Sequence, residues 1–384
     1  MKRNHVITLL LASVITVTCT SQPAITFKKH IISATFVSEG VATGDVNNDG
    51  NTDILAGNYW YEAPSFKPHM LHADTVNPVP SYSTTFLNYT LDVNNDGWID
   101  LIRFDQPGAE CAWYENPQHK QGLWQKHLIL AGAGNENPAF ADVDGDGRND
   151  IICNDTLAKE VIWLRAPVAP RDTAWQRTAI SRNKNLGTHR YTHGLGFGDL
   201  DQDGKKDVLL KSGWWQSPVN PLTPDWTFTA ADFGDDCANM FVLDADKDGD
   251  MDVITSSTHN YGIWWHEQKR SDSKTVWETH LISKQFSQSH ALAMEDINGD
   301  GNPDLITGKR YKAHNGGDPG TDEPAVLYWF EYIPGRQPRW LPHEIDNNSG
   351  IGNSFAVTDL NKDGLPDIIV SNKKGVYYFE QSGK

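Results

Sequence analysis

Seven short acidic loops contain the residues of this sequence that are best suited to chemistry. The pattern D-x-[DN]-x-D-G-x-x-D occurs seven times in the 384 residues. Oxygen atoms at positions 1, 3, 5 and 9 converge on one centre, and the glycine at position 6 allows the sharp turn that brings them together. Carboxylate and amide oxygens are hard ligands that favour Ca²⁺. We therefore expect up to seven structural calcium sites, and seven matching copies favour this over acidic turns without metal.

The expected calcium ligands are Asp45, Asn47, Asp49 and Asp53; Asp92, Asn94, Asp96 and Asp100; Asp142, Asp144, Asp146 and Asp150; Asp199, Asp201, Asp203 and Asp207; Asp244, Asp246, Asp248 and Asp252; Asp296, Asn298, Asp300 and Asp304; and Asp359, Asn361, Asp363 and Asp367.

A second group of side chains has the types that β-elimination requires. This reaction needs a base that is neutral near pH 7, a cation that stabilises an enolate, and an acid for the leaving oxygen. By residue type the candidates are His193 or His290 for the base, Arg190, Lys211 or Arg310 for the cation, and Tyr191, Tyr261 or Tyr311 for the acid, with His259 and His314 completing the group. Two alternatives remain open: an ordinary polar loop surface, and a Zn²⁺ site made by His193, His259 and His290.

The elements that position these residues are predicted to be β-strands. Apolar, β-branched runs such as Asp150-Ile-Ile-Cys follow the acidic loops, and no helical pattern flanks them, which excludes EF-hands. Each repeat ends on an aromatic strand, such as Trp113-Tyr-Glu, and an outer strand such as Trp124-Gln-Lys-His comes next. In the fifth repeat we align Trp264 with these tryptophans, so His266 takes the place of the glutamate. The loops start 45 to 63 residues apart, which is the size of a four-stranded propeller blade.

The chain is therefore expected to be one all-β domain, a seven-bladed β-propeller with four antiparallel strands per blade over residues 27–380. It begins with an outer strand (27–32) and ends with a third strand (376–380), so the N-terminal strand should complete the last blade and close the ring. The acidic loops would share one face, and the second group of side chains would lie on the opposite face, over three consecutive blades.

Recurrence separates scaffold from site. His193 and His290 each lie six residues before an acidic loop, at the expected mouth of the central channel, where the other repeats have Glu39, Phe86, Glu136, Ala238 and Asn353. Five other histidines recur at one outer-strand position and are expected to hydrogen-bond neighbouring blades: His30, His69, His127, His280 and His343.

The N-terminus predicts export. Residues 1–19 have a basic start and a short apolar run, which is typical of a signal peptide, and residues 20–26 form a linker. Cys19 is either a lipidation site or part of a plain secretion signal, so the protein is expected to be periplasmic, extracellular or an outer-membrane lipoprotein. Any membrane contact would be through the lipid anchor.

Net charge and cysteine content limit the classes of binding partner and the cross-links that we expect. A net charge of −17 is the wrong sign for nucleic acid binding. Cys111, Cys153 and Cys237 suggest no disulfide framework and are expected to be buried in the core. We expect a monomer.

The acidic loops and their spacing resemble the FG-GAP, or VCBS, repeat family of calcium-binding β-propellers over essentially the whole mature chain. The wider patterns at 192–199, 211–215, 259–264 and 308–314 are similar to bacterial propellers related to the propeller part of aldos-2-ulose dehydratases, and more distantly to seven-bladed ulvan and rhamnose–glucuronate lyases. The cupin part of the dehydratase is absent. The resemblance implies a carbohydrate lyase or dehydratase acting on a uronate or keto-sugar; the alternative is a non-catalytic propeller that binds a glycan or protein at the cell surface.

Overall fold

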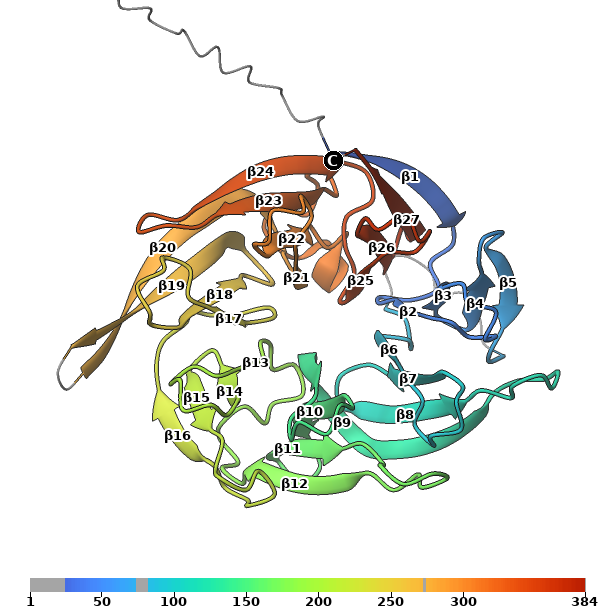
Figure 1. The fold of residues 1–384 in the computed structure, drawn as a ribbon, viewed down its shortest axis with the longest axis horizontal. Coiled ribbons are helices and arrows are strands. Elements are labelled where there is room, and N and C mark those ends of the chain that lie inside the picture. Colours follow the sequence, from blue (N-terminus) through green and yellow to red (C-terminus); the bar gives the residue numbers. More distant parts are fainter. Residues whose placement is uncertain (1–24, 74–81, 272–273, 384) are drawn as a thin grey trace, which may run out of the picture.

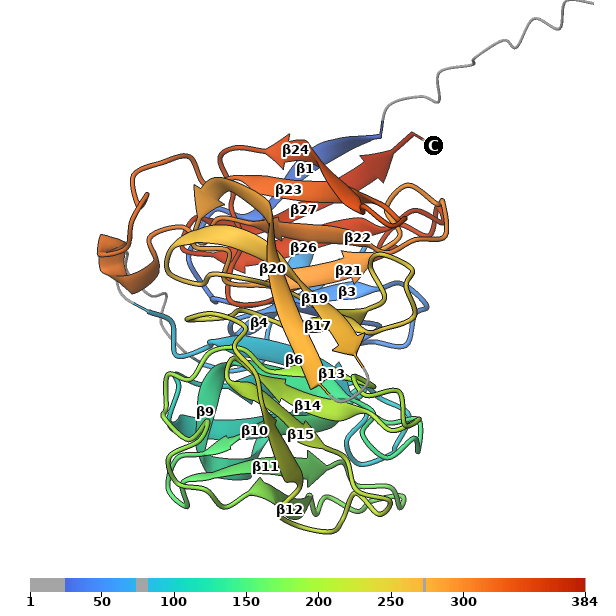
Figure 2. The same cartoon turned by 90° about the vertical axis from the view of Figure 1, so that its left-hand side faces the viewer.

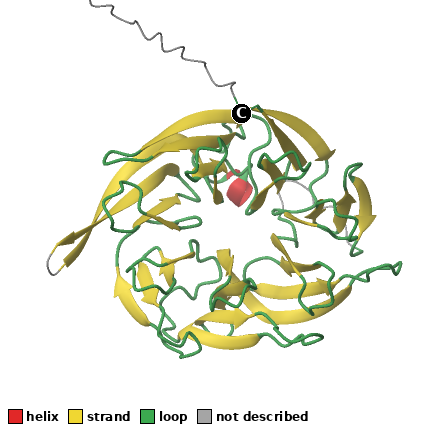
Figure 3. Ribbon diagram, in the orientation of Figure 1, coloured by secondary structure: helices red, strands yellow, loops and turns green. Residues whose placement is uncertain are grey.

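Short antiparallel β-strands provide nearly all the regular structure of this protein. The computed structural model describes residues 25–73, 82–271 and 274–383, which contain 27 strands and one short 3₁₀ helix, η1 (Ala313–Gly316). The sheets are arranged around a common centre (Figure 1), and Figure 3 shows how little helix accompanies them. The expected signal peptide, including Cys19, and most of the expected linker lie outside the described residues. No helix in the described ranges is long and apolar enough to span a membrane.

Four sheets consist of four consecutive strands each. They are β2 (Ala42–Gly44), β3 (Asp53–Ala56), β4 (Tyr59–Glu62) and β5 (Lys67–Met70); β13 (Gly196–Gly198), β14 (Asp207–Leu210), β15 (Gly213–Gln216) and β16 (Thr227–Ala230); β17 (Phe241–Leu243), β18 (Asp252–Ser256), β19 (Tyr261–Ser271) and β20 (Lys274–Ser287); and β21 (Leu292–Glu295), β22 (Asp304–Gly308), β23 (Leu327–Ile333) and β24 (Arg339–Asp346).

A fifth sheet joins the two ends of the described chain. Its order is β1-β27-β26-β25, formed by β1 (Thr26–Ser33), β25 (Phe355–Thr358), β26 (Asp367–Asn372) and β27 (Gly375–Ser382). Strand β1 pairs antiparallel with β27, from Thr26 opposite Ser382 to Ser33 opposite Val376.

The sixth sheet has seven strands because one long strand is shared. Its order is β12-β11-β10-β9-β8-β7-β6, formed by β6 (Leu87–Leu91), β7 (Asp100–Phe104), β8 (Ala109–Glu115), β9 (Gln125–Ala141), β10 (Asp150–Asp155), β11 (Glu160–Arg165) and β12 (Gln176–Ser181). The first half of β9 pairs with β8 and its second half with β10, and Ala133 is paired on both sides. The expectation of an all-β fold built from antiparallel four-stranded sheets is confirmed in this general form.

The seven acidic loops all occupy the same place, the hairpin between the first and second strand of a four-strand unit. The strand after each loop is buried along its whole length, as β26 shows for Asp367–Asn372, so the core lies between neighbouring sheets at these strands. The three cysteines in the described residues are free and buried, as expected.

The ninth residue of every loop ties its sheet together. In the first loop, Asp53 Oδ2 accepts from the Val46 amide at 3.0 Å and Oδ1 accepts from the Ala63 amide at 2.8 Å. The same two bonds recur in the other six loops. These seven aspartates are fully or almost fully buried, so the position is structural whatever it contributes to metal binding.

The recurring histidines pack within their own sheets, and not against neighbouring ones as we expected. His127, for example, stacks on Trp113 with ring centroids 4.3 Å apart, and its Nε2 lies 2.9 Å from Glu115. The fifth repeat corrects our alignment, because Trp265 stacks on His280 and Glu267 pairs with that histidine at 2.6 Å. Trp265 lies opposite His280 just after a register shift in the pairing of β19 with β20, as Trp113 lies opposite His127 just after one in the pairing of β8 with β9.

Candidate functional site

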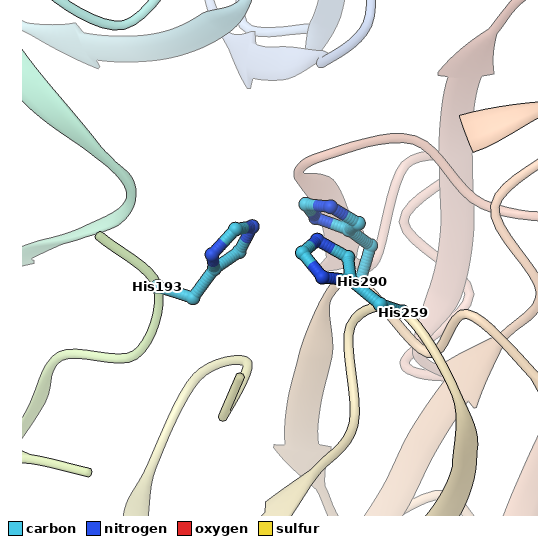
Figure 4. A group of neighbouring side chains, drawn as sticks. All are labelled: His193, His259 and His290. Atoms are coloured by element: carbon cyan, nitrogen blue, oxygen red, sulfur yellow. The ribbon is translucent and has the colours of Figure 1, made fainter. Parts of the chain in front are cut away.

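Three histidines from separate parts of the chain meet in one cluster. His193 precedes β13, His259 lies in the turn between β18 and β19, and His290 lies between β20 and β21. His193 faces the other two rings, at centroid distances of 4.5 Å to His259 and 5.3 Å to His290 (Figure 4). One nitrogen of each ring lies within 4.8 Å of the others. The sequence therefore singled out three residues that the fold brings together.

Asp236 orients His259. Asp236 Oδ2 lies 3.1 Å from His259 Nδ1, so Nδ1–H donates and Nε2 keeps its lone pair. Among the described residues Nε2 has no hydrogen-bond partner. Burial lowers the pKa of His259, the neighbouring His193 and His314 lower it further, and the charge of Asp236 opposes them. The ring is thus a neutral imidazole with a free lone pair and a carboxylate behind it, which is the arrangement of a general base.

Glu136 places a buried negative charge beside the other two histidines. Its Oε2 lies 3.6 Å from Nε2 of His193 and 3.6 Å from Nε2 of His290. Burial alone would raise the pKa of Glu136, but His193 and the charge of Arg310 outweigh it, so this pKa lies below its ordinary value. The carboxyl group is therefore ionised at neutral pH and favours positive charge in the cluster.

Arg310 is fixed beneath the cluster. Its side chain is 1% exposed and bonds to Glu39 at 3.2 Å and to His290 Nε2 at 3.0 Å. Because a guanidinium only donates, His290 Nε2 must accept, which leaves the proton on Nδ1. Burial, followed by the charge of Arg310, lowers the pKa of His290 well below its ordinary value. His290 is therefore neutral and presents an N–H donor.

Two adjoining hollows are lined by part of this cluster. A cavity of about 350 Å³ is lined by Tyr82, His193, His259 and His314, among others. A larger hollow of about 880 Å³ lies beside it, and both are lined by His189, Tyr191, His193 and Asp236. The two hollows therefore adjoin each other along these four residues.

The remaining candidates from the sequence fall into different surroundings. Arg190 and Lys211 line the larger hollow, and Lys211 Nζ lies 4.0 Å from Asp236 Oδ1. Tyr191 is 48% exposed and lines both hollows. The Tyr261 hydroxyl donates to Glu323 at 2.6 Å.

The long segment after β22 carries His314 to the cluster. His314 packs against His259 with centroids 4.2 Å apart and bonds to Asp318 at 2.9 Å. The buried amine of Lys309 donates to the carbonyls of Gly320 and Glu323, which fastens this segment to the body of the protein. Figure 2 shows η1 within it, projecting from one side of the molecule.

Sequence reasoning did not assign Asp236, Glu136 or Glu39 to the site, although signals for all three exist. Glu39 and Glu136 occupy the same position before their acidic loops as His193 and His290, and the fold brings all four together. Counting outward along the β17–β18 hairpin leads to within one residue of this pair, because Phe241 pairs with Ile254 and the register then changes by one, so that Cys237 bridges Ser257. Asp236 therefore lies opposite Thr258, whose amide donates to its carbonyl, and its carboxylate reaches the adjacent His259.

The acidic loops form a second group of candidate sites. In three of them the carboxylate oxygens at positions 1, 3 and 5 lie within 4.8 Å of one another: Asp142, Asp144 and Asp146; Asp199, Asp201 and Asp203; and Asp244, Asp246 and Asp248. The first of these also receives a protein cation, because Arg165 contacts Asp144 at 2.5 Å and Asp146 at 3.1 Å.

Comparisons with known proteins identify the repeats. FG-GAP-like repeats match residues 92–153 and 244–307, and an FG-GAP repeat matches residues 351–380. No curated protein matches the chain. A solved structure of an Agrocybe aegerita lectin, described as recognising non-reducing terminal N-acetylglucosamine, is 18% identical, covers 80% of each chain and has a TM-score of 0.48. The chain therefore carries FG-GAP repeats on an all-β, propeller-like fold.

Proposed function

We propose that the chain is an exported carbohydrate lyase or dehydratase that acts by β-elimination on a calcium-stabilised, seven-bladed propeller. The scaffold part of the proposal is supported by the seven acidic loops, each in the first hairpin of a four-strand unit. Strand β9 would serve as the outer strand of the second blade and the inner strand of the third. The pairing of β1 with β27 would close the ring.

Calcium and export belong to the same proposal. The loop of Asp244, Asp246 and Asp248 supports Ca²⁺ binding most directly, because three negative charges at such short range repel one another unless a cation lies between them. In the other two loops with clustered carboxylates, Arg165 and Lys205 already neutralise part of the charge. The basic and apolar start of the chain supports export.

One observation carries the catalytic proposal: His259 lines a cavity, Asp236 holds its Nδ1, and its buried Nε2 has no hydrogen-bond partner among the described residues. We therefore place the base at His259 and not at His193, whose Nε2 lies 3.6 Å from Glu136, whereas Asp236 lies 3.1 Å from His259 Nδ1. His290 is fully buried and its Nε2 is occupied by Arg310, which leaves no lone pair for a substrate proton.

The reaction would proceed as a proton transfer followed by loss of an alkoxide. His259 Nε2 removes the proton from the carbon next to a carbonyl or carboxylate, and the C–H electron pair moves into an enolate. The C–O bond at the next carbon then breaks, its electron pair goes to the leaving oxygen, and that oxygen takes a proton from an acid. Asp236 stabilises the imidazolium that forms on His259.

Other groups at the hollows fit the remaining roles. Lys211 lies beside Asp236 and supplies positive charge for the enolate. Tyr191 lines both hollows and fits the acid, whereas Tyr261 is bonded to Glu323. Arg310 is buried against Glu39 and would position His290 without touching substrate.

The alternative of a Zn²⁺ ion on the three histidines fits only in part. His259 is suitable, because a zinc-bound imidazole normally donates its other N–H to an acceptor such as Asp236. His290 is not, because Arg310 donates to its Nε2 and leaves a proton on the nitrogen that a metal would need. The proposed elimination therefore does not use a zinc ion on these three histidines.

The test is a screen for turnover. The protein should be incubated with uronate polysaccharides and with keto-sugars while the absorbance of an unsaturated product is followed, and His259→Ala and His193→Ala should lose the signal. Metal analysis of the purified protein would show whether zinc is present. If no sugar is turned over but a glycan binds and the same variants lose it, the protein is a binding propeller and the catalytic proposal fails.

A further inference from the structure

The larger hollow beside the histidine cavity has a charge opposite to that of the protein as a whole. The chain has a formal net charge of −17. Yet the lining of this 880 Å³ hollow includes the cations Lys159, Lys184, Arg190 and Lys211 and only one carboxylate, Asp236. A hollow lined mainly by one sign of charge concentrates ligands of the other sign.

These cations are available to a ligand. Lys159, Lys184 and Arg190 are exposed, and none forms an ion pair with a carboxylate of the described residues. The two acidic residues of the same hairpin, Asp155 and Glu160, are instead held by Arg177 at 3.2 and 2.6 Å. The positive charge at the hollow is therefore not cancelled locally.

The wall of the hollow is fixed in place before any ligand arrives. The buried amide of Asn154 donates to the carbonyls of Gly187 and His189 at 2.9 and 2.8 Å. The backbone amides of Asn135 and Glu136 donate to the carbonyls of Arg190 and Thr192. Because this loop is tied to β9 and β10, its cations are presented with little ordering cost.

We infer that the larger hollow binds the continuation of an acidic sugar chain, one residue of which enters the histidine cavity. The volume lies near the upper end of the range of about 300–1,000 Å³ for small-molecule sites, which favours a ligand of several sugar units. The inference builds on the proposed function, and it names the substrate class as an anionic oligosaccharide, carboxylated or sulfated, and not a neutral keto-sugar.

The experiment is a binding measurement in the absence of turnover. The mature chain carrying His259→Ala is titrated calorimetrically with an oligouronate tetramer, a sulfated tetrasaccharide and a neutral tetrasaccharide. Lys184→Gln and Arg190→Gln are each added to this background. Lys120→Gln, an equal loss of charge at an exposed lysine outside the lining of both hollows, is the control.

We expect at least one acidic tetramer to bind more tightly than the neutral one, with an affinity that falls as salt is added. Lys184→Gln and Arg190→Gln should each weaken that binding about threefold, and the two together about tenfold, since exposed ion pairs contribute modestly. The control should change nothing, and the acidic tetramer that binds more tightly identifies the anion.

Two results separate this inference from the proposed function. The inference about the larger hollow would be overturned by equal binding of acidic and neutral tetramers, or by Lys184→Gln and Arg190→Gln variants that behave like the control, even if the protein turns over a small uronate. Charge-dependent binding that requires Lys184 and Arg190 would support it even if no sugar is ever cleaved.

Discussion

The replacement of Asp236 by Asn tests the assignment of the base most directly. The carboxylate lies 3.1 Å from His259 Nδ1, with 41% of its side chain and 25% of the histidine exposed. At that distance an effective dielectric constant of roughly 40 to 80 gives about 1.3 to 2.7 kcal/mol of stabilisation of the imidazolium. Losing it should lower kcat/KM about ten- to a hundredfold, since about 1.4 kcal/mol corresponds to a factor of ten.

The pH dependence of kcat/KM is a second, independent test of His259 as the base. The pKa of His259 is already lowered by burial, while Asp236 raises it. Removing Asp236 must therefore lower this pKa further. A base is active when deprotonated, so activity is lost as the pH falls through its pKa. The acid limb of kcat/KM should accordingly move to lower pH in Asp236→Asn.

The assay is the initial rate of unsaturated-product formation across pH, with the acidic sugar that the protein turns over. The matched control is Asp235→Asn, the same change at the adjacent, exposed residue. An unchanged kcat/KM with an unshifted acid limb would show that His259 is not the base. A shift to higher pH would contradict the electrostatic argument.

Four further predictions concern the scaffold. Chelation of divalent cations should lower the melting temperature and added Ca²⁺ should restore it, because ions that bind only the folded loops stabilise the folded protein by mass action. An unchanged melting curve would count against calcium binding. Deletion of Thr26–Ser33 exposes the edge of β27, and we expect aggregation or a clear loss of thermal stability in place of a soluble, equally stable monomer. His127→Ala loses its stack on Trp113 and a part-exposed ion pair, and chemical denaturation should show a cost of about 1–2 kcal/mol with no loss of activity per folded molecule. Arg310→Met leaves buried carboxylates unpaired and should cost about 3–5 kcal/mol, partly recovered on adding Glu39→Gln; no recovery would show that the charge pair is not the cause.

The repeated parts of the fold could be predicted because the residue spacing within each acidic loop determines its local hydrogen bonds. Asp53 and its six equivalents recur at fixed spacing, and their bonds to two backbone amides explain why the spacing is needed. The continuity of β9 could not be predicted, because Gly132 and Gly134 are typical of a loop. Gly134 instead lies where a Cβ would collide with Asn154, so the missing side chain is what lets the strand pass.

The site was predictable only where it broke the repeat. His193 and His290 stood out because their positions hold other residue types elsewhere. Asp236 did not, since aspartate is abundant in this sequence and it reaches His259 only through the pairing beyond β17 and β18, where Cys237 bridges Ser257. The tautomer of His290 depends on Arg310, whose partner Glu39 is 271 positions away in the sequence, a contact that no local pattern encodes.

This distribution of contacts explains how one repeated unit yields a single site. The residue six positions before an acidic loop is brought toward the centre in each repeat, so Glu39, Phe86, Glu136 and His290 all come to face Arg310. Two carboxylates, Glu39 and Glu136, then meet the guanidinium of Arg310, and the buried amine of Lys373 adds a second cation that interacts with Glu39. The differences among these residues therefore fix the tautomer of His290, because Arg310 donates to its Nε2 and leaves the proton on Nδ1.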